Sequence, residues 1–592
     1  MLKYVRAFKK REGNKMKHFK LDKDFKPHII KTLSNEELNL LSVEIRELII
    51  DKCSEFGGHL ASNLGNVELT IALHKHFNLP EDKLLFDVGH QCYTHKILTG
   101  RPLENLRQEN GTSGFQKRNE SIYDTYEAGH SSTSISTAVG MAITRDLDKQ
   151  NYEVIAVIGD GTISNGLAFE AINHLGSLNT KVIIILNDNN MCIGETVGSL
   201  HKSINSTSNE SIFTKLGLDY IGNVDGHNFE ELAIALEKAK QNEKSIVVHV
   251  STKKGKGYIH AENDKTGFYH GVGPFDKETG KELNTNDNQV SWSKVYARLI
   301  ECVMNENEKS IVVHPATGIG SYLNRVVTNY DQRSFDVGIC EEHSITLASG
   351  MALNNYHPYV VIYSTFLQRA YDQVHHDLAR LDLPVTLLVD RAGLVGNDGE
   401  THQGIFDTSF LLNMPNTSVA MAKNQEEAAR LMKLSKDYNH LLAIRYPKGK
   451  TTYQKINSLD EVKPLNLGEW IIEKEDSKET CLISYGPLLE EVLDKVKDKN
   501  ITVINALFQK PLNTDYLTKI LNYKNVLIYD PYSIEESFAY HVEIALRKMG
   551  FKGNIRSYAI KNEFITSGSI NQQLRRYNLD VDSILEEINK VL

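Results

Sequence analysis

Residues 154–160 read VIAVIGD, and residues 181–188 read KVIIILND. Both runs are almost continuously apolar, which is typical of strands buried on both faces of a parallel sheet. The segment between them, residues 167–178, has the apolar spacing of a helix. A strand, a helix and a strand in this order predict a parallel α/β unit.

The same alternation recurs along the rest of the chain. A helix is expected at residues 292–304, followed by strand-like runs at 310–317, 357–364, 383–390 and 440–447. A third group of runs lies at 480–486, 501–507 and 525–531, with a helix expected at 535–549. We therefore predict an α/β protein with three domains, each a mostly parallel sheet flanked by helices, at residues 26–285, 290–455 and 465–592.

The first twenty residues contain eight Lys or Arg and one acidic residue, and we interpret residues 1–25 as a basic N-terminal tail. An organelle transit peptide and a start at Met16 are the alternatives. In the whole chain of 592 residues, 67 basic residues face 76 acidic ones, without long runs of either sign. This balance argues against a general binder of nucleic acid or of membrane surfaces.

No stretch approaches the roughly 18 apolar residues of a membrane helix, so no membrane association is expected. The six cysteines are scattered without a CxxC spacing, and no signal peptide precedes them. This usage argues against a disulfide framework or a zinc site, and it favours a cytoplasmic protein.

Polar residues follow the two strands of the opening unit. Asp160 lies between two glycines after the first strand, and LNDNNM at residues 186–191 ends the second. Both strand ends should emerge at the same sheet edge, so the Asp160 carboxylate, the Asn189 amide oxygen and the Met191 backbone carbonyl can converge on Mg²⁺. The helix start after Gly161 would offer N–H groups to a diphosphate. For GDG alone, an ordinary turn is the alternative.

Together these two motifs resemble the thiamine-diphosphate signature of the transketolase superfamily. The resemblance implies thiamine diphosphate and Mg²⁺ as cofactors, with the first domain binding the diphosphate and the second binding the aminopyrimidine. The segment FDVGICEEH at residues 335–343 is similar to the one that carries the family's catalytic glutamate, and it places Glu341 at that position. Glu341 would hydrogen-bond a pyrimidine nitrogen and assist proton removal from the cofactor. A surface carboxylate is the alternative for this segment alone.

Longer motifs narrow the resemblance to the 1-deoxy-D-xylulose-5-phosphate synthase family, which ordinary transketolases match less well. In the first domain they are GGHLASNLG at residues 57–65, DVGHQCYTHKILTGR at 87–101 and GHSSTSIS at 129–136. In the second domain they are YSTFLQRAYDQ at 363–373, DRAGLVGNDGETHQG at 390–404 and RYPKG at 445–449.

The resemblance also implies roles for individual residues. Those expected around thiamine diphosphate are His90, Gly129, His130, Ser131, Gly161, Thr162, Asn189, Tyr258, Glu341 and Phe366. Those expected to receive substrate, a phosphorylated aldehyde above all, are Tyr363, Arg391, Asp398, His402, Arg445 and His270. An arginine can form a forked pair with a phosphate. His59, His90 and His402 are expected to act with Glu341 in catalysis, because a neutral imidazole can take up or release a proton near pH 7.

The implied reaction decarboxylates pyruvate and joins the two-carbon remainder to D-glyceraldehyde 3-phosphate. Its product feeds the non-mevalonate isoprenoid route and, in bacteria, thiamine biosynthesis, and the resemblance further implies a homodimer. The alternatives are a transketolase of ketose phosphates and a non-catalytic paralogue that binds partners. Two segments depart from the family pattern: residues 194–211 are shortened, and PYSIEESFAY at residues 531–540 replaces a glycine-rich stretch in the third domain.

Overall fold

The computed structural model describes residues 18–190, 197–204, 211–283 and 288–592. The chain divides into two compact units, Met1–Thr285 and Asn286–Leu592. Most of the expected basic tail, and also Met191 and much of the shortened segment, lie outside the described residues. The first domain was expected from residue 26, but Phe25 is already buried in its core. The packed part of the first unit therefore begins before that residue.

The first unit contains a five-stranded sheet in which every neighbouring pair is parallel. Its strand order is β1-β2-β3-β5-β4, with β1 at Lys83–Phe86, β2 at Val154–Gly159, β3 at Ile183–Asp188, β4 at Asp219–Asp225 and β5 at Ile246–Ser251. The strands β2 and β3 are the two apolar runs of the opening motif. The predicted parallel unit is therefore confirmed.

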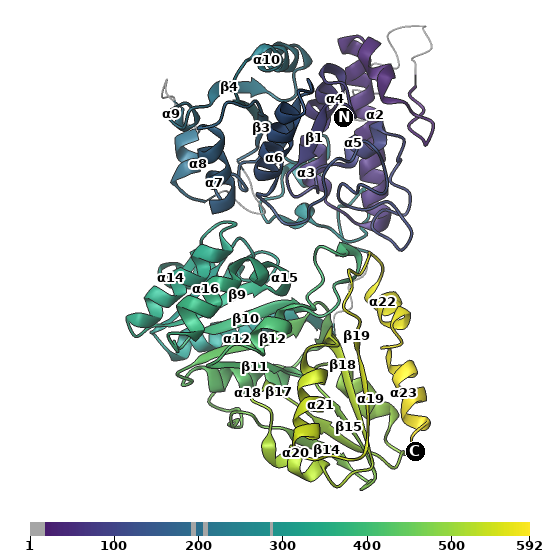
Figure 1. The fold of residues 1–592 in the computed structure, drawn as a ribbon, viewed down its shortest axis with the longest axis vertical. Coiled ribbons are helices and arrows are strands. Elements are labelled where there is room, and N and C mark those ends of the chain that lie inside the picture. Colours follow the sequence, from purple (N-terminus) through teal and green to yellow (C-terminus); the bar gives the residue numbers. More distant parts are fainter. Residues whose placement is uncertain (1–17, 191–196, 205–210, 284–287) are drawn as a thin grey trace. The chain divides into compact units, whose positions relative to one another are not determined.

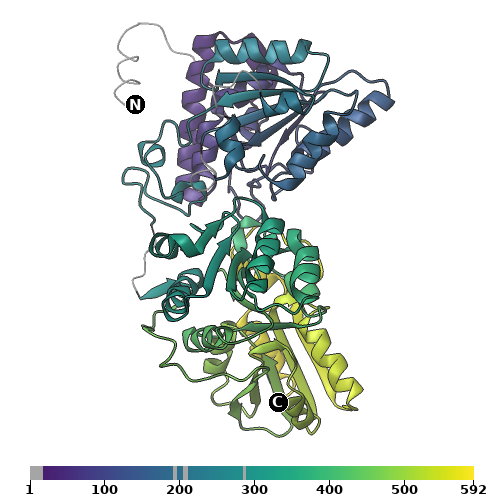
Figure 2. The same ribbon diagram turned by 90° about the vertical axis from the view of Figure 1, so that its left-hand side faces the viewer.

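Helices cover both faces of this sheet (Figures 1 and 2). On β2, Ile155 and Val157 point to one apolar cluster while Ala156 and Ile158 point to another. The first cluster includes residues of α2 (Asn35–Phe56), α4 (Val67–His76) and α10 (Phe229–Gln241), and the second includes residues of α6 (Ser134–Leu147) and α7 (Gly166–Leu175). Shorter helices are η1 Pro27–Thr32, α3 Leu60–Gly65, α5 Tyr93–Leu98, α8 Ser199–Ile204, α9 Ile212–Lys215, α11 Ile259–Glu262 and η2 Phe268–His270.

The second unit contains two larger sheets. The seven-stranded sheet has the order β17-β11-β12-β10-β9-β7-β8, and all its pairs are parallel except that of β17 with β11. Its strands are β7 Ser310–His314, β8 Ser334–Asp336, β9 His357–Tyr363, β10 Thr386–Ala392, β11 Thr417–Met421, β12 Leu441–Pro447 and β17 Phe508–Lys510. A two-stranded ribbon pairs β6 (Gln289–Ser291) with β13 (Lys450–Thr452).

The five-stranded sheet has the order β14-β16-β15-β18-β19, and only β14 runs antiparallel to its neighbour. Its strands are β14 Ile471–Glu475, β15 Thr480–Ser484, β16 Thr502–Asn505, β18 Asn525–Ile534 and β19 Asn554–Ile560. Strand β17 comes from the predicted third domain but extends the seven-stranded sheet, and one apolar cluster contains residues from both sheets. The two sheets therefore pack as one unit.

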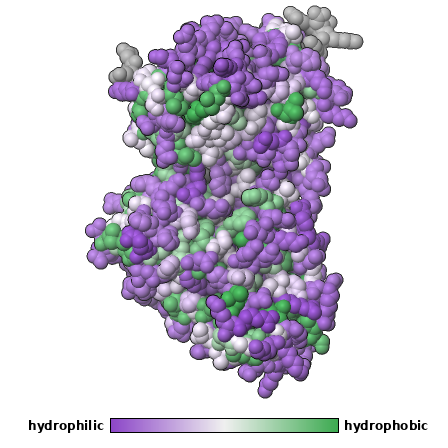
Figure 3. Space-filling model, viewed as in Figure 1, coloured by the Kyte–Doolittle hydropathy of each residue, from purple (hydrophilic) through white to green (hydrophobic). Residues whose placement is uncertain are grey.

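The longer helices of this unit are α12 Trp292–Glu306, α14 Glu341–Leu353, α18 Gln425–Ser435, α19 Leu488–Lys495, α21 Phe538–Lys548 and α23 Val581–Asn589. The shorter ones are α13 Asn324–Asn329, η3 Asp331–Arg333, α15 Ser364–Leu367, η4 Gln368–Ala370, α16 Tyr371–Gln373, η5 Val374–Ala379, η6 Gly396–Asp398, α17 Asp407–Leu411, α20 Thr514–Ile520 and α22 Ile570–Arg576. Among the described residues, no helix is long and apolar enough to cross a membrane. The face in Figure 3 is mostly hydrophilic, with smaller apolar areas between.

Candidate active site

The carboxyl ends of β2 and β3 bring two of the expected metal ligands to one edge of the first sheet. These strands are parallel neighbours in which Gly159 lies opposite Asn187, so Asp160 and Asn189 both leave the sheet at this edge. Asp160 is 4% exposed. A carboxylate and an amide oxygen are ligands that suit Mg²⁺. The third expected ligand, Met191, lies outside the described residues.

The helical pattern expected at residues 167–178 begins at Gly166 as α7. The N–H groups expected after Gly161 therefore do not belong to the first turn of this helix. The reason is a cap: the side chain of Asn165 accepts a hydrogen bond from the backbone N–H of Leu167 and starts the helix there. The hydroxyl of Thr162 donates to the carbonyl of Gly159 and closes the intervening turn. The N–H groups near Gly161 therefore belong to a tight turn.

The rest of the NDN motif is engaged inside the protein. The Asn187 side chain donates to Gln91 and accepts a hydrogen bond from the hydroxyl of Thr252. Asp188 lies 2.9 Å from the Nε2 atom of His249, and both side chains are buried. Asn189 directly follows the last residue of β3, at the sheet edge. Gln91 lies in the DVGHQCYTHKILTGR motif but was assigned no role there, and Thr252 lies outside the quoted motifs.

Three predicted histidines lie together in the first unit. The ring centres of His59 and His90 are 5.4 Å apart, those of His90 and His270 are 5.4 Å apart, and those of His59 and His270 are 6.1 Å apart. The Asn63 side-chain amide donates hydrogen bonds to the backbone carbonyls of both His59 and His90 at 2.7 Å, and so connects the segments that carry them. Residues separated by about two hundred positions therefore form one cluster, which is the arrangement expected of a site.

Two rings of the cluster, His90 and His270, are held in the neutral form. Burial, reinforced by the positive charge of Lys254, lowers the pKa of His90 to about 3. The same two causes hold the pKa of His270 well below its usual value. The Nδ1 atoms of His90 and His270 are buried and have no hydrogen-bond partner within the described structure. These two rings can therefore offer hydrogen bonds to a bound polar molecule without carrying charge.

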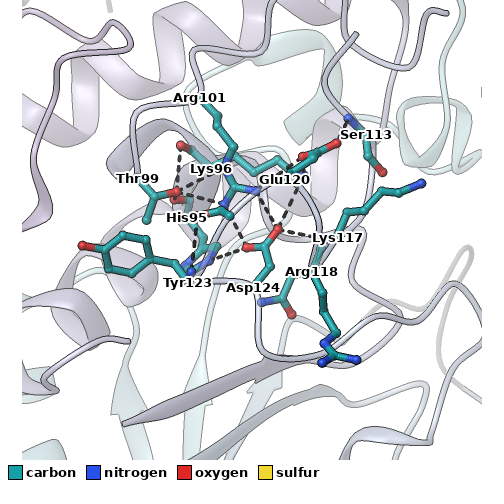
Figure 4. Close-up of polar contacts among 12 residues, drawn as sticks. His95, Lys96, Thr99, Arg101, Ser113, Lys117, Arg118, Glu120, Tyr123 and Asp124 are labelled. Carbon is teal, nitrogen blue, oxygen red and sulfur yellow. Dashed lines mark hydrogen bonds and ion pairs between the residues drawn. The ribbon is translucent and has the colours of Figure 1, made fainter. Parts of the chain in front are cut away.

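Asp124 holds the long segment that leads to the GHSS motif (Figure 4). Its carboxylate, fully buried, accepts hydrogen bonds from both terminal nitrogens of Arg101 at 2.6 and 2.8 Å and from the Lys117 backbone at 2.8 Å. It also lies 2.9 Å from the Nε2 atom of His95, whose other ring nitrogen meets His74. Hydrogen bonds to a buried ion are strong, so this network fixes the segment.

The GHSS motif is tied to the turn after β2. Buried Asp87 accepts hydrogen bonds from the backbone N–H groups of Ser132 and Ser134. The Ser132 hydroxyl donates to the carbonyl of Thr162 at 2.8 Å. The expected diphosphate residues Gly129, His130 and Ser131 therefore lie next to the Gly161–Thr162 turn, as a shared binding role requires.

Tyr258 differs from the expectation. Its ring is 7% exposed and packs against Tyr269 and Phe275, and its hydroxyl donates to the carbonyl of Lys277. The side chain is therefore used in the core of the first unit, because its apolar ring and its hydroxyl both find partners there.

In the second unit, Glu341 begins helix α14 and is 2% exposed. Burial raises its pKa to about 7, although the Arg369 guanidinium, 3.7 Å from Oε2, opposes this shift. The Oε2 atom has no hydrogen-bond partner within the described structure. A buried carboxyl that is partly protonated near pH 7 can donate to a ring nitrogen, so the residue fits the role implied by the family.

Aromatic rings and cations gather at the ends of β9 and β10. The ring of Phe366 stacks on Tyr363 with centres 5.4 Å apart, and it meets His402 edge-on at 5.7 Å. The Arg391 guanidinium lies over the Tyr363 ring, 3.9 Å from its centre. Four of the residues expected around cofactor and substrate, Phe366, Tyr363, His402 and Arg391, are therefore together.

Asp398 links two cations at this place. Its carboxylate lies 2.6 Å from the Nζ atom of Lys448 and 4.0 Å from Arg391. The Lys448 side chain is 39% exposed and that of Arg391 is 27% exposed. Both can therefore reach an anionic ligand. Sequence reasoning selected Arg391 from this pair and overlooked Lys448, although the RYPKG motif contains it.

Arg445, the arginine chosen from the same motif, is placed elsewhere. Its side chain is 0% exposed and forms a forked pair with the equally buried Asp407, with nitrogen to oxygen distances of 2.7 and 2.8 Å. It also donates to the carbonyl of Tyr532. The expectation that Arg445 receives the substrate phosphate is therefore corrected, because its charge is already neutralised in the interior.

A family model described as 1-deoxy-D-xylulose-5-phosphate synthase matches residues 21–211 and 202–252. A second, described as the transketolase pyrimidine binding domain, matches residues 288–454. A 1-deoxy-D-xylulose-5-phosphate synthase from Clostridium acetobutylicum is 41% identical over 610 residues, covering 94% of this chain and 97% of the relative. The chain belongs to the 1-deoxy-D-xylulose-5-phosphate synthase family.

Synthases from Macrococcus caseolyticus and Listeria innocua are 41% and 40% identical over 617 and 630 residues. They cover 95% and 96% of this chain and 98% and 97% of their own lengths. A solved transketolase from Campylobacter jejuni is 17% identical, covers 94% of this chain and all of its own, and has a TM-score of 0.43. The family assignment does not depend on this structure.

For a member of this synthase family, thiamine diphosphate is the expected cofactor, and the recognised pyrimidine binding domain supports it. The second unit also has an apolar groove of about 470 Å³, whose lining includes Leu347, Met351 and Tyr356. None of the residues expected to bind cofactor or substrate lines it. The groove therefore does not mark the synthase site.

Proposed function

We propose that this chain catalyses the decarboxylation of pyruvate and the transfer of the two-carbon remainder to D-glyceraldehyde 3-phosphate, forming 1-deoxy-D-xylulose 5-phosphate. The observation that carries the proposal is Glu341, a buried carboxyl with a pKa raised to about 7, whose Oε2 atom accepts no hydrogen bond within the described structure. Burying a carboxyl is costly, and the nearby Arg369 offsets that cost without donating a hydrogen bond to Oε2, so this environment fits a catalytic role. The family assignment supplies the substrates.

Bound thiamine diphosphate would supply the electron sink for decarboxylation. Glu341 would hold a proton toward the pyrimidine, and the stacked Phe366 and Tyr363 rings would offer an apolar wall beside it. In the first unit, the turn at Gly161–Thr162 and the GHSS motif would receive the diphosphate. Asp160 and Asn189, with Met191 from outside the described residues, would hold Mg²⁺ against the diphosphate oxygens.

Arg391 and Lys448 would bind the phosphate of the acceptor, with Asp398 fixing their separation. His59, His90, His270 and His402 would orient the carbonyl and hydroxyl groups of the substrates and carry protons between them. Neutral rings suit this task, because a neutral imidazole donates through one nitrogen and accepts through the other.

We further propose a homodimer, on the family resemblance, and a cytoplasmic enzyme, since the described cysteines form no disulfide. Light scattering of the purified protein tests the dimer.

The decisive experiment incubates the purified full chain with pyruvate, D-glyceraldehyde 3-phosphate, thiamine diphosphate and Mg²⁺. Release of CO₂ together with the deoxy sugar phosphate is expected, and both should stop when Mg²⁺ is removed with a chelator. A reaction in which xylulose 5-phosphate serves as donor while pyruvate does not would instead identify a transketolase. Absence of turnover with either donor would favour the non-catalytic alternative.

The variants Asp160→Ala and Asn189→Ala test the metal site. Each removes one oxygen ligand, so each should raise the Mg²⁺ concentration needed for half-maximal thiamine diphosphate binding at least tenfold. Asp188→Asn is a poor control because Asp188 contacts His249. Glu170→Ala, which alters a side chain of α7, is the better control and should leave the Mg²⁺ requirement unchanged.

A further inference from the structure

Residues 393–404 form a closed loop that contains Asp398 and His402. We call this segment the acceptor loop. Its two ends are joined by a pair of backbone hydrogen bonds between Gly393 and Gly404, at 2.6 and 2.8 Å. Within it, η6 begins at Gly396 and ends at Asp398. Because its ends are bonded to each other, the position of the loop determines where Asp398 and His402 lie.

The acceptor loop is held from the five-stranded sheet domain by Gln573 on α22 (yellow in Figure 1). The Gln573 carbonyl oxygen accepts the N–H of Gly396 at 3.2 Å, and its amide donates to the carbonyl of the same glycine at 3.1 Å. The amide also donates to the carbonyl of Thr566 at 2.9 Å. Gln573 is completely buried. One side chain thus satisfies both backbone groups of Gly396 and connects them to its own domain.

Close packing reinforces this contact. Gly396 has a φ of +77°, and a Cβ atom there would lie 3.2 Å from the carbonyl oxygen of Gly568. At Gly399, φ is +76° and a Cβ atom would lie 2.6 Å from the hydroxyl of Ser567. The side-chain amide of Gln403, also on the loop, donates a hydrogen bond to the carbonyl of Ile565 at 3.3 Å. Two glycines on the acceptor loop therefore pack so closely against residues 567–568 that a larger side chain would not fit at either position.

The contact lies next to the cations expected to bind phosphate. Asp398 is two residues after Gly396 in the same turn, and its carboxylate contacts Lys448 at 2.6 Å and Arg391 at 4.0 Å. Lys448 also donates to the carbonyl of Val395, the residue before Gly396. A shift of Gly396 would therefore move the carboxylate that contacts both cations. Small displacements of such groups weaken binding strongly.

We propose that Gln573 is a positioning residue for the phosphorylated acceptor, acting through Gly396 and Asp398. The inference rests on the proposed function, because it assumes that the acceptor phosphate binds beside Asp398. It gives the C-terminal domain a part in substrate recognition. It also predicts a selective effect: steps that involve only pyruvate and thiamine diphosphate should not depend on Gln573.

The test compares Gln573→Ala and Gln573→Met with Tyr529→Phe in the holoenzyme. Tyr529 is a matched control, since it is buried in the same domain and donates one hydrogen bond, to the carbonyl of Leu579, away from the acceptor loop. Both Gln573 variants should raise the KM for D-glyceraldehyde 3-phosphate at least about fivefold, while the KM for pyruvate and the affinity for thiamine diphosphate stay within about twofold. Tyr529→Phe should lower the thermal midpoint without changing any KM.

Hydrogen exchange reports whether the contact with Gly396 is lost, while the contrast between the two KM values separates positioning from a purely structural role. The Gly396 amide should exchange faster in the Gln573 variants than in Tyr529→Phe at equal distance below their thermal midpoints. An unchanged acceptor KM in an active, folded Gln573 variant would overturn the inference, as would an equal rise in Tyr529→Phe. If Gln573→Ala does not fold, Gln573→Asn, which keeps the amide but shortens its reach, decides by the same comparison. A wild-type protein without synthase activity would instead refute the proposed function.

Discussion

Arg445 donates two hydrogen bonds to the carboxylate of Asp407, and neither side chain reaches the surface. This relationship separates two arginines that the sequence placed in one role. The Arg391 side chain is 27% exposed and lies beside Asp398. Their variants should therefore fail in different ways.

Arg445→Met should destabilise the second unit by about 3 to 5 kcal/mol, because it leaves the Asp407 charge buried without a partner. The double variant Arg445→Met/Asp407→Leu should recover most of that loss. Both tryptophans of the chain, Trp292 and Trp470, are buried in the second unit, so tryptophan fluorescence during urea unfolding reports on it. A selective rise in the KM for the acceptor, with stability intact, would restore Arg445 to the substrate site.

Arg391→Ala should raise the KM for D-glyceraldehyde 3-phosphate by roughly tenfold to a hundredfold, because a hydrogen bond to a charged group is lost. The KM for pyruvate should hardly change. Arg325→Ala is the matched control, since that arginine is 74% exposed on α13. Steady-state kinetics with each substrate varied in turn measures the contrast. Equal changes for both substrates would contradict the phosphate role.

Glu341→Gln should reduce kcat by about a hundredfold or more, which is the usual rate enhancement from a general acid or base. It should also alter the pH dependence of stability without cofactor. Burial raises the pKa of Glu341 to about 7, so between its ordinary value and pH 7 the folded state binds more protons than the unfolded state. The carboxyl therefore destabilises the fold increasingly as pH rises through this range.

Between pH 5 and pH 8, wild type should lose about 2 kcal/mol more unfolding free energy than Glu341→Gln. Urea unfolding followed by tryptophan fluorescence at both pH values measures this difference. Glu342→Gln, at the neighbouring position on α14, is the control and should follow wild type. Parallel pH profiles for wild type and Glu341→Gln would show that the carboxyl titrates normally.

The contribution of His90 to the unfolding free energy should depend on pH in the opposite direction to that of Glu341. Burial lowers the pKa of His90 to about 3, so the folded state binds fewer protons than the unfolded state between pH 3 and about 6.5. Its contribution to stability is therefore lost as pH falls through this range. From pH 7 to pH 5, wild type should lose about 2 kcal/mol more than His90→Gln, as measured by calorimetry of the first unit's transition. A difference near zero would mean that His90 is accessible and titrates as in a peptide.

The fold was predictable because the strands on which it depends are long apolar runs. Residues 154–160 and 181–188 were expected as parallel strands, and they form β2 and β3. The end of the turn after Asp160 was less predictable. The helical pattern from residue 167 predicted the start of α7 to within one residue, but the turn at residues 161–165, which Asn165 ends by capping the helix, was not expected.

The grouping of the candidate site followed motif order, and His59, His90 and His270 do lie together. Their assigned roles, like that of Glu341, stay predictions. Arg445 shows where motifs fail, because RYPKG contains two cations and only burial distinguishes them. Gln573 could not be found at all, because its partner is a backbone amide 177 positions away and backbone contacts leave no pattern in side-chain chemistry.

The hydrogen bonds between Gly393 and Gly404 close the acceptor loop on itself, so its interior could be exchanged without cutting the sheet. Yet Gly396 and Gly399 fit against residues 567–573 with little clearance. A chimera that takes residues 394–403 from a relative with another acceptor would meet a foreign surface at Gly568 and Gln573. Moving acceptor preference between these enzymes should therefore require both segments to be transplanted together.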